Sequence, residues 1–203
     1  MLLADIHNAN LTSDERGPQK PEQVDISLLN DLLEESAEKS RIRAFAEEIN
    51  AHLSEDREGS EPTQLSHTDL NPDNILWAGN GPCLIDWEQA CMAYYSVDLM
   101  STGLMWSIRA DTDFDERLFG RFCETYRDRY TGGHSCDFEF AYWHIVGWGF
   151  GWLMHNLRRG SLQDLSESER DKCKRAVAKM TRRILSRAAQ RSVLLGAWER
   201  NYT

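Results

Sequence analysis

The stretch "LSHTDLNPDNILW" (residues 65–77) places a histidine, an aspartate and an asparagine close together, at His67, Asp69 and Asn74. A second stretch, "CLIDWEQA" (83–90), follows with Asp86. Between the two, Asn80-Gly81 separates short apolar runs, which is a strong signal for a tight β-hairpin. Because a hairpin folds back on itself, we expect Asn74 and Asp86 to converge at its open end.

These side chains have the chemistry that phosphoryl transfer from a nucleotide requires. The transfer needs a carboxylate that orients the attacking hydroxyl and accepts its proton, and oxygen ligands that hold Mg²⁺ against the phosphates. Asp69 can supply the carboxylate, and Asn74 and Asp86 offer the oxygen ligands that Mg²⁺ prefers. Asp and Asn are also common turn formers, so "DLNPDN" would make a good loop without any catalysis.

Helical patterns flank this central segment on both sides. Apolar residues recur at helical spacing, and polar or turn-forming stretches separate the runs. The predicted helices cover residues 1–9, two parts of 25–53, then 97–108, 115–130, 138–159 and 167–191. The sequence therefore predicts an α+β protein that is mostly α, with a small β-hairpin in the middle.

The pattern His67-x-Asp69-x-x-x-x-Asn74 matches the catalytic loop of the protein-kinase-like superfamily. "LIDWE", in place of the Asp-Phe-Gly motif, resembles the aminoglycoside phosphotransferase and choline kinase branch. "YYSVDLM" is similar to the segment that follows in that branch, and "ADIHNANL" resembles the first helix after the hinge between the lobes. Thr68 departs from the Gly that is usual between the His and the Asp.

The resemblance implies a protein-kinase-like large, C-terminal lobe, forming a single domain over residues 1–203. Leading helices and a connector would occupy 1–64, the catalytic loop and metal hairpin 65–99, and a helical subdomain 100–203. It further implies ATP or GTP and Mg²⁺ as cofactors, and a hydroxyl of an aminoglycoside-, choline- or sugar-like molecule as acceptor. It assigns these roles: Asp69 as catalytic base, Asn74 and Asp86 as magnesium ligands, His67 and Asp98 as supporting residues, and Glu88 on the acceptor side.

The smaller, N-terminal lobe of such enzymes carries a glycine-rich loop over the phosphates and a lysine that pairs with them. Neither pattern occurs in this sequence. We weigh three explanations: a truncated chain, a small lobe on a separate partner, and a remnant that binds without catalysing. The alternative function is therefore a non-catalytic interaction module, and an exposed inner face is expected to find an N-terminal-lobe partner or to self-associate.

The other unusual stretch is aromatic, "CDFEFAYWHIVGWGFGWLM" (136–154). On a helix, Trp148 falls on a stripe with Trp152 beside it, and such a wall could hold a cationic acceptor by cation–π contacts. The plainer interpretation is that the helix is core, apolar nearly all round. Gly147 and Gly151 are expected to let another backbone or a ligand come close.

Composition excludes several classes of protein. The net charge of −10 argues against general nucleic-acid binding, which depends on neutralising phosphates. No apolar run reaches the roughly 20 residues that span a bilayer. The five cysteines form no C-x-x-C pair, which suits reduced thiols. We expect a cytoplasmic protein that binds neither membrane nor nucleic acid.

Overall fold

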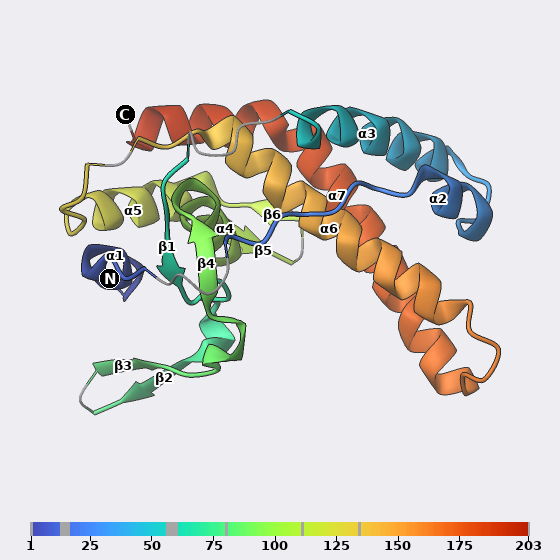
Figure 1. Cartoon of the computed structure of the whole chain (residues 1–203), viewed down its shortest axis with the longest axis horizontal. Coiled ribbons are helices and arrows are strands. Elements are labelled where there is room, and N and C mark those ends of the chain that lie inside the picture. Colours follow the sequence, from blue (N-terminus) through green and yellow to red (C-terminus); the bar gives the residue numbers. More distant parts are fainter. Residues whose placement is uncertain are drawn as a thin grey trace. The chain divides into compact units, whose positions relative to one another are not determined.

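The computed structural model describes residues 2–12, 17–55, 61–79, 81–110, 112–133 and 135–202 (Figure 1). The chain divides into two compact units. Unit 1 comprises Met1–Lys20, Arg57–Tyr142 and Val193–Thr203, and unit 2 comprises Pro21–Asp56 and Trp143–Ser192. These units cut across the three segments that the sequence predicts, and the description of the chain as one domain stays a prediction.

The strands described by the structure all belong to unit 1, which also holds helices from both ends of the chain. Its elements are α1 (Leu2–Ala9), β1 (Thr63–Ser66), the 3-10 turn η1 (Pro72–Asn74), β2 (Ile75–Ala78), β3 (Gly81–Leu84), the 3-10 turn η2 (Trp87–Gln89), β4 (Cys91–Tyr94), α4 (Tyr95–Ser107), β5 (Ile108–Arg109), β6 (Asp113–Phe114) and α5 (Glu116–Arg127). The prediction of a mostly α protein with a small central hairpin is confirmed.

Strands β1 and β4 form the frame of the central segment. They pair antiparallel, with Thr63 opposite Tyr94 and Ser66 opposite Cys91. The segment 67–90 therefore starts and ends at neighbouring points within unit 1. The predicted residues His67, Asp69, Asn74, Asp86 and Glu88 all lie on this segment. β4 runs straight into α4, whose residues are mostly buried.

The predicted hairpin is present as β2 and β3, with Ile75 opposite Leu84 and Ala78 opposite Gly81. Gly81 of the predicted Asn80-Gly81 turn is the first residue of β3. Asn80 itself lies outside the described residues. Gly81 has a φ of 109°, a conformation that favours glycine.

Close packing of α4 on α5 forms the core of unit 1. A Cβ at Gly103 would lie 2.8 Å from the ring of Phe119, so the absence of a side chain lets the two helices approach. Phe119 also meets Trp198 edge to face, with ring centroids 4.5 Å apart. Phe119 and Trp198 are both fully buried.

Unit 2 is helical. It contains α2 (Ile26–Leu32) and α3 (Ala37–Leu53), most of α6 (Phe138–Gly160) and the first part of α7 (Glu167–Tyr202). Asp25 and Ser36 cap α2 and α3 by accepting from the backbone N–H three residues on. Gly147 of α6 allows a close approach, because a Cβ there would lie 2.8 Å from Pro21, whereas Gly151 has nothing within 4 Å.

The structure differs from the predicted elements in three places. The β1–β4 pair and the two-residue pair β5–β6 were not predicted, because such short strands carry little periodicity. Helix α7 runs to Tyr202 instead of ending at 191, since Leu194, Ala197 and Trp198 continue its buried side.

No helix in the described ranges is both long and apolar enough to cross a membrane.

Candidate active site

His67 connects the catalytic loop to the hairpin. Its Nε2 donates a hydrogen bond to the carbonyl oxygen of Ile85 at 2.9 Å, and the backbone N–H of Ile85 donates to the carbonyl of Asn74 at 3.1 Å. His67 is fully buried, and Trp87 packs edge-on against its ring at 4.7 Å. The residue before Asp86 is thus fixed to the loop from both sides.

Two amide side chains hold the carboxylate of Asp69. Nδ2 of Asn71 donates to Oδ1 at 2.9 Å, and Nδ2 of Asn74 donates to Oδ2 at 2.8 Å. Nδ2 of Asn74 also donates to the carbonyl oxygen of Asp69 at 2.8 Å. Both carboxylate oxygens are therefore oriented, and each keeps lone pairs for a further partner.

Sequence reasoning missed Asn71. A signal for it exists in "LNPDN", because an Asn before Pro commonly turns the chain by accepting from the backbone two residues on. The structure has this turn, with the N–H of Asp73 donating to Oδ1 of Asn71 at 2.8 Å. The oxygen of the amide shapes the loop while its nitrogen orients Asp69.

Asp86 is an exposed residue in the left-handed region, at φ 63° and ψ 57°. Non-glycine residues held there are uncommon and concentrate at functional sites. Within the described part of the chain, its carboxylate has no hydrogen-bond or ion-pair partner. The same holds for the amide oxygen of Asn74, whose nitrogen makes the bonds to Asp69.

The carboxylate of Asp86 and the amide oxygen of Asn74 are the kinds of oxygen that Mg²⁺ prefers, and neither is used by another described residue. Among the described residues, no group of three or more His, Cys, Asp or Glu side chains could hold a metal ion. The magnesium site of Asn74 and Asp86 stays a prediction, since Mg²⁺ usually binds through one or two carboxylates together with substrate phosphates.

Thr68 also adopts a left-handed conformation, with φ 61°. This explains why a Gly is usual at this place in the resembling enzymes, because a β-branched residue is disfavoured there. The hydroxyl of Thr68 donates to the carbonyl oxygen of Gln89 at 2.8 Å, which ties the loop to the last residue of η2.

Asp98 lies behind the loop and is almost fully buried. Its Oδ2 accepts from the hydroxyl of Ser66, the last residue of β1, and from Nε2 of His7 at 2.9 Å. Nδ1 of His7 pairs with the hydroxyl of Tyr126 at 2.6 Å. This buried network joins α1, β1, α4 and α5, and fixes the strand from which the loop departs.

The predicted acceptor-side residues make no described contact with the catalytic loop. Glu88 is exposed in η2, two residues after Asp86. Trp148 is half-buried and Trp152 is exposed, and both lie on the part of α6 that belongs to unit 2. Their roles stay predictions.

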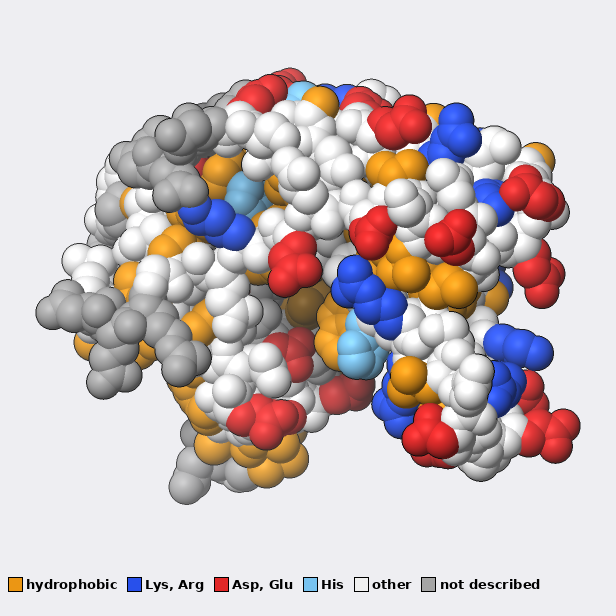
Figure 2. Space-filling view, turned by 45° about the vertical axis from the view of Figure 1, so that its right-hand side comes forward, with side chains coloured by type: hydrophobic (Ala, Val, Ile, Leu, Met, Phe, Trp, Pro, Cys, Tyr) orange, Lys and Arg blue, Asp and Glu red, His pale blue; other side chains and the backbone are white. Residues whose placement is uncertain are grey.

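Large apolar side chains are exposed around the hairpin. Leu76 is 54% exposed, Trp77 74% and Trp87 49%. Figure 2 shows hydrophobic side chains gathered at the lower end of the molecule, with acidic side chains just above them. A concentration of exposed apolar residues is typical of a surface that another structure covers.

A family model matches the first two thirds of the chain. The model of the phosphotransferase enzyme family (APH) matches residues 1–132, which include α1, the central segment and α5. No curated protein matches the sequence.

Several solved structures are similar. Choline kinase LicA from Streptococcus pneumoniae is 20% identical, with a TM-score of 0.46, and the match covers 89% of this chain and 61% of that one. A choline/ethanolamine kinase family protein from Mesorhizobium loti is 14% identical (TM-score 0.46; 89% and 64% covered). Choline kinase from Cryptosporidium parvum is 11% identical (TM-score 0.48; 97% and 66% covered). The chain therefore spans about 61–66% of the length of these kinases.

Proposed function

The chain belongs to the phosphotransferase enzyme family, and on that premise we propose that it carries the residues that transfer the γ-phosphate of ATP or GTP to a hydroxyl of a small molecule. The observation that carries this proposal is the orientation of Asp69 by Asn71 and Asn74. A turn-forming loop would not need a carboxylate held at both oxygens and also left half exposed.

In this proposal Asp69 is the catalytic base. It accepts a hydrogen bond from the acceptor hydroxyl, aligns its oxygen with the phosphorus, and takes its proton as the new bond forms. The amides of Asn71 and Asn74 keep the carboxylate in one rotamer, so little reorganisation is needed when the acceptor arrives. His67 and Asp98 act indirectly by fixing Ile85 and Ser66.

Asn74 and Asp86 would hold Mg²⁺, which neutralises charge on the transferring phosphate when nucleotide is bound. The two hydrogen bonds on Ile85 and the left-handed backbone at Asp86 fix the main chain from which that carboxylate extends. The nucleotide base is left open, because base recognition in such enzymes lies largely outside the segment described here.

The proposed acceptor is aminoglycoside-, choline- or sugar-like. Glu88, Trp148 and Trp152 are the proposed acceptor-side residues, because a carboxylate and indole faces both attract a cationic or amino-substituted alcohol. The chain's surplus of acidic residues favours such an acceptor over an anionic one.

The second candidate is a non-catalytic module that keeps the fold to bind a partner. The exposed apolar side chains of Leu76, Trp77 and Trp87 favour it as much as they favour a covering N-terminal lobe. Nucleotide turnover separates the two candidates, since a module without catalysis has no need of an oriented Asp69.

The decisive experiment measures transfer from γ-labelled ATP and GTP to a panel of small alcohols. It uses the chain together with any protein that co-purifies with it and with the product of a longer reading frame, if one extends it. Wild type and Asp69→Asn are compared, with Asp73→Asn as the matched control in the same loop. Transfer that depends on Asp69 and not on Asp73 supports the enzyme; equal transfer, or none, supports the module.

A further inference from the structure

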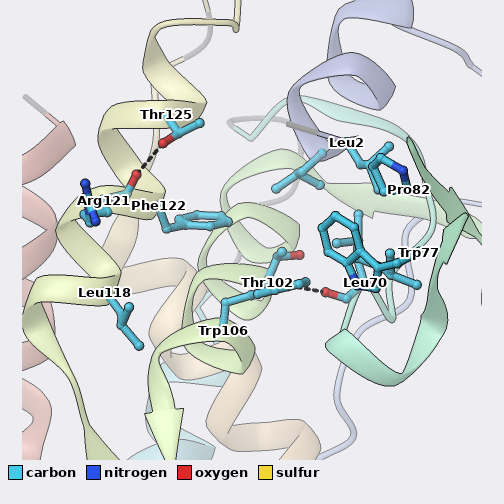
Figure 3. Close-up of a pocket in the computed structure, with 12 residues that line it drawn as sticks. Leu2, Leu70, Trp77, Pro82, Thr102, Trp106, Leu118, Arg121, Phe122 and Thr125 are labelled. Atoms are coloured by element: carbon cyan, nitrogen blue, oxygen red, sulfur yellow. Dashed lines mark hydrogen bonds between the residues drawn. The ribbon is translucent and has the colours of Figure 1, made fainter. Parts of the chain in front are cut away.

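Unit 1 contains a pocket of about 330 Å³ on the side of the hairpin that Ile75, Trp77 and Pro82 face (Figure 3). α1, α4 and α5 supply its other walls, and Leu70 closes it toward the catalytic loop. The volume falls within the roughly 300–1,000 Å³ of natural small-molecule sites.

The walls of this pocket are apolar and aromatic. Trp77, Trp106 and Phe122 present ring surfaces, and several leucines line the wall beside them. Arg121 is the one charged residue on the wall within the described ranges, and Figure 3 shows its guanidinium on the far side of α5 from Phe122. The pocket therefore disfavours a phosphate, a nucleotide or a metal ion, whose charges would lose hydration without compensation.

One polar group breaks this pattern. Thr102 is only 2% exposed, and in Figure 3 its side chain points into the space between Phe122 and Trp77. Hydroxyls on helices usually donate to the carbonyl four residues earlier, as Ser107 does to Gly103 and Thr125 to Arg121, both at 2.7 Å. The Thr102 hydroxyl makes no such bond and has no other partner among the described residues. It is not one of the fully buried side-chain atoms without a partner, which agrees with a hydroxyl that opens into the pocket.

A hydroxyl that opens into a pocket and has no internal partner can form a hydrogen bond with a ligand that enters the pocket. The indole N–H of Trp106 is already used, because it donates to the carbonyl of Leu70 at 2.9 Å. The hydroxyl of Thr102 is thus a polar group of the pocket wall that can bind a ligand.

We infer that this pocket binds a small uncharged molecule with an aromatic body and one hydrogen-bonding group, of the phenol or indole type. The aromatic rings of the wall pack against the aromatic body of the ligand, and the hydroxyl of Thr102 forms a hydrogen bond with its polar group. Leu70 and Ile75 directly follow Asp69 and Asn74, so the ligand lies against the residues that support the catalytic loop. Binding of this ligand does not depend on the proposed catalysis.

The test titrates the chain with 2-naphthol and with naphthalene, which differ by one hydroxyl, by ligand-observed NMR. Naphthol is expected to bind about 2–10-fold more tightly, as one net hydrogen bond provides. Thr102→Val keeps the shape of the side chain and should make the two affinities equal. Thr125→Phe, at the rim, should weaken both, while Glu124→Phe on the exposed side of α5 should change neither.

Naphthol that binds Thr102→Val as tightly as wild type would overturn the role of the hydroxyl. Absence of binding to wild type up to the solubility of both probes, or equal binding to Thr125→Phe and Glu124→Phe, would overturn the pocket as a site. A circular-dichroism melt of each variant shows that it is folded, so that a lost signal is assigned to the pocket.

Discussion

A single amide nitrogen joins Asn74 to Asp69 twice, by donating at 2.8 Å to a carboxylate oxygen and at 2.8 Å to the backbone carbonyl of the same residue. The amide oxygen of Asn74 must then point the other way. One residue thereby orients the proposed base and presents a ligand atom to the proposed metal, so a change at Asn74 affects both functions. Asp69 and Asp86 each carry one function and make cleaner tests.

Asp69→Asn is predicted to remove phosphoryl transfer in any assembly that shows it. The amide keeps the shape of the side chain but cannot accept the proton, and general-base catalysis contributes about 10²–10⁴-fold. The loss should appear in kcat, with the unfolding midpoint little changed. Asp73→Asn, whose carboxylate is exposed, should retain activity. A near-normal kcat for Asp69→Asn would exclude this residue as the base.

Asp86→Asn is predicted to abolish the metal-dependent part of nucleotide binding. Asn tolerates the left-handed backbone at this position, so this variant removes the charge without adding strain, whereas Asp86→Ala does both. Loss of an outer-shell partner already weakens metal sites by about 10–100-fold, and loss of a ligand should do at least as much. Calorimetry with nucleotide, with and without Mg²⁺, measures the difference, and unchanged Mg²⁺ dependence would contradict the assignment.

Much of this arrangement follows from the sequence, because the hairpin signal and the spacing of His67, Asp69 and Asn74 are local. Their contacts are local too: the loop hydrogen bonds span two to five residues. The pairing of Ser66 with Cys91 is not local. The two strands that contain them are only four residues long, so their hydrophobic periodicity is too short to predict the pair. The unpartnered hydroxyl of Thr102 was also beyond prediction, since it depends on walls from α1, α4, α5 and the hairpin.

Thr68→Gly and Thr68→Val should affect the free energy of unfolding differently. A non-glycine residue in the left-handed region is strained by about 1–2 kcal/mol, and glycine relieves this while losing a hydrogen bond of about 0.5–1.5 kcal/mol. Valine loses the bond and keeps the strain. We expect glycine to be near wild type and valine to be about 1 kcal/mol less stable by urea unfolding. Greater destabilisation by glycine than by valine would contradict this.

The cysteines are predicted to differ in reactivity. Burial raises the pKa of Cys123 and of Cys136 to about 12, so at pH 8 both remain thiols, which are poor nucleophiles. Burial also raises the pKa of Cys91, and Cys173 is buried. Cys83 is exposed on β3. Iodoacetamide at pH 8 should modify Cys83 first, and labelling of Cys123 and Cys136 should quicken as pH rises toward 12. A fast phase that survives in Cys83→Ser would refute the ranking.

Residues 1–203 by themselves are predicted not to be a competent kinase. The transferring phosphate needs charge neutralised on several sides, and the sequence has no glycine-rich loop and no strand with the lysine that serves one of them. Loss of a single such donor reduces kcat by about 10²–10³-fold. The exposed side chains of Leu76, Trp77 and Trp87 indicate where a covering structure would lie, on both faces of the hairpin and beside η2.

Two measurements check this prediction together. Sedimentation of purified 1–203 should show self-association that Trp77→Ser weakens, because an exposed indole on the hairpin is the largest apolar contribution to that surface. Transfer assays on the same sample should show turnover at least about 10²-fold below ordinary enzyme rates of 1–10³ s⁻¹. Efficient transfer by a monomer with no added protein would refute the idea, and would mean that another part of this chain replaces the small lobe.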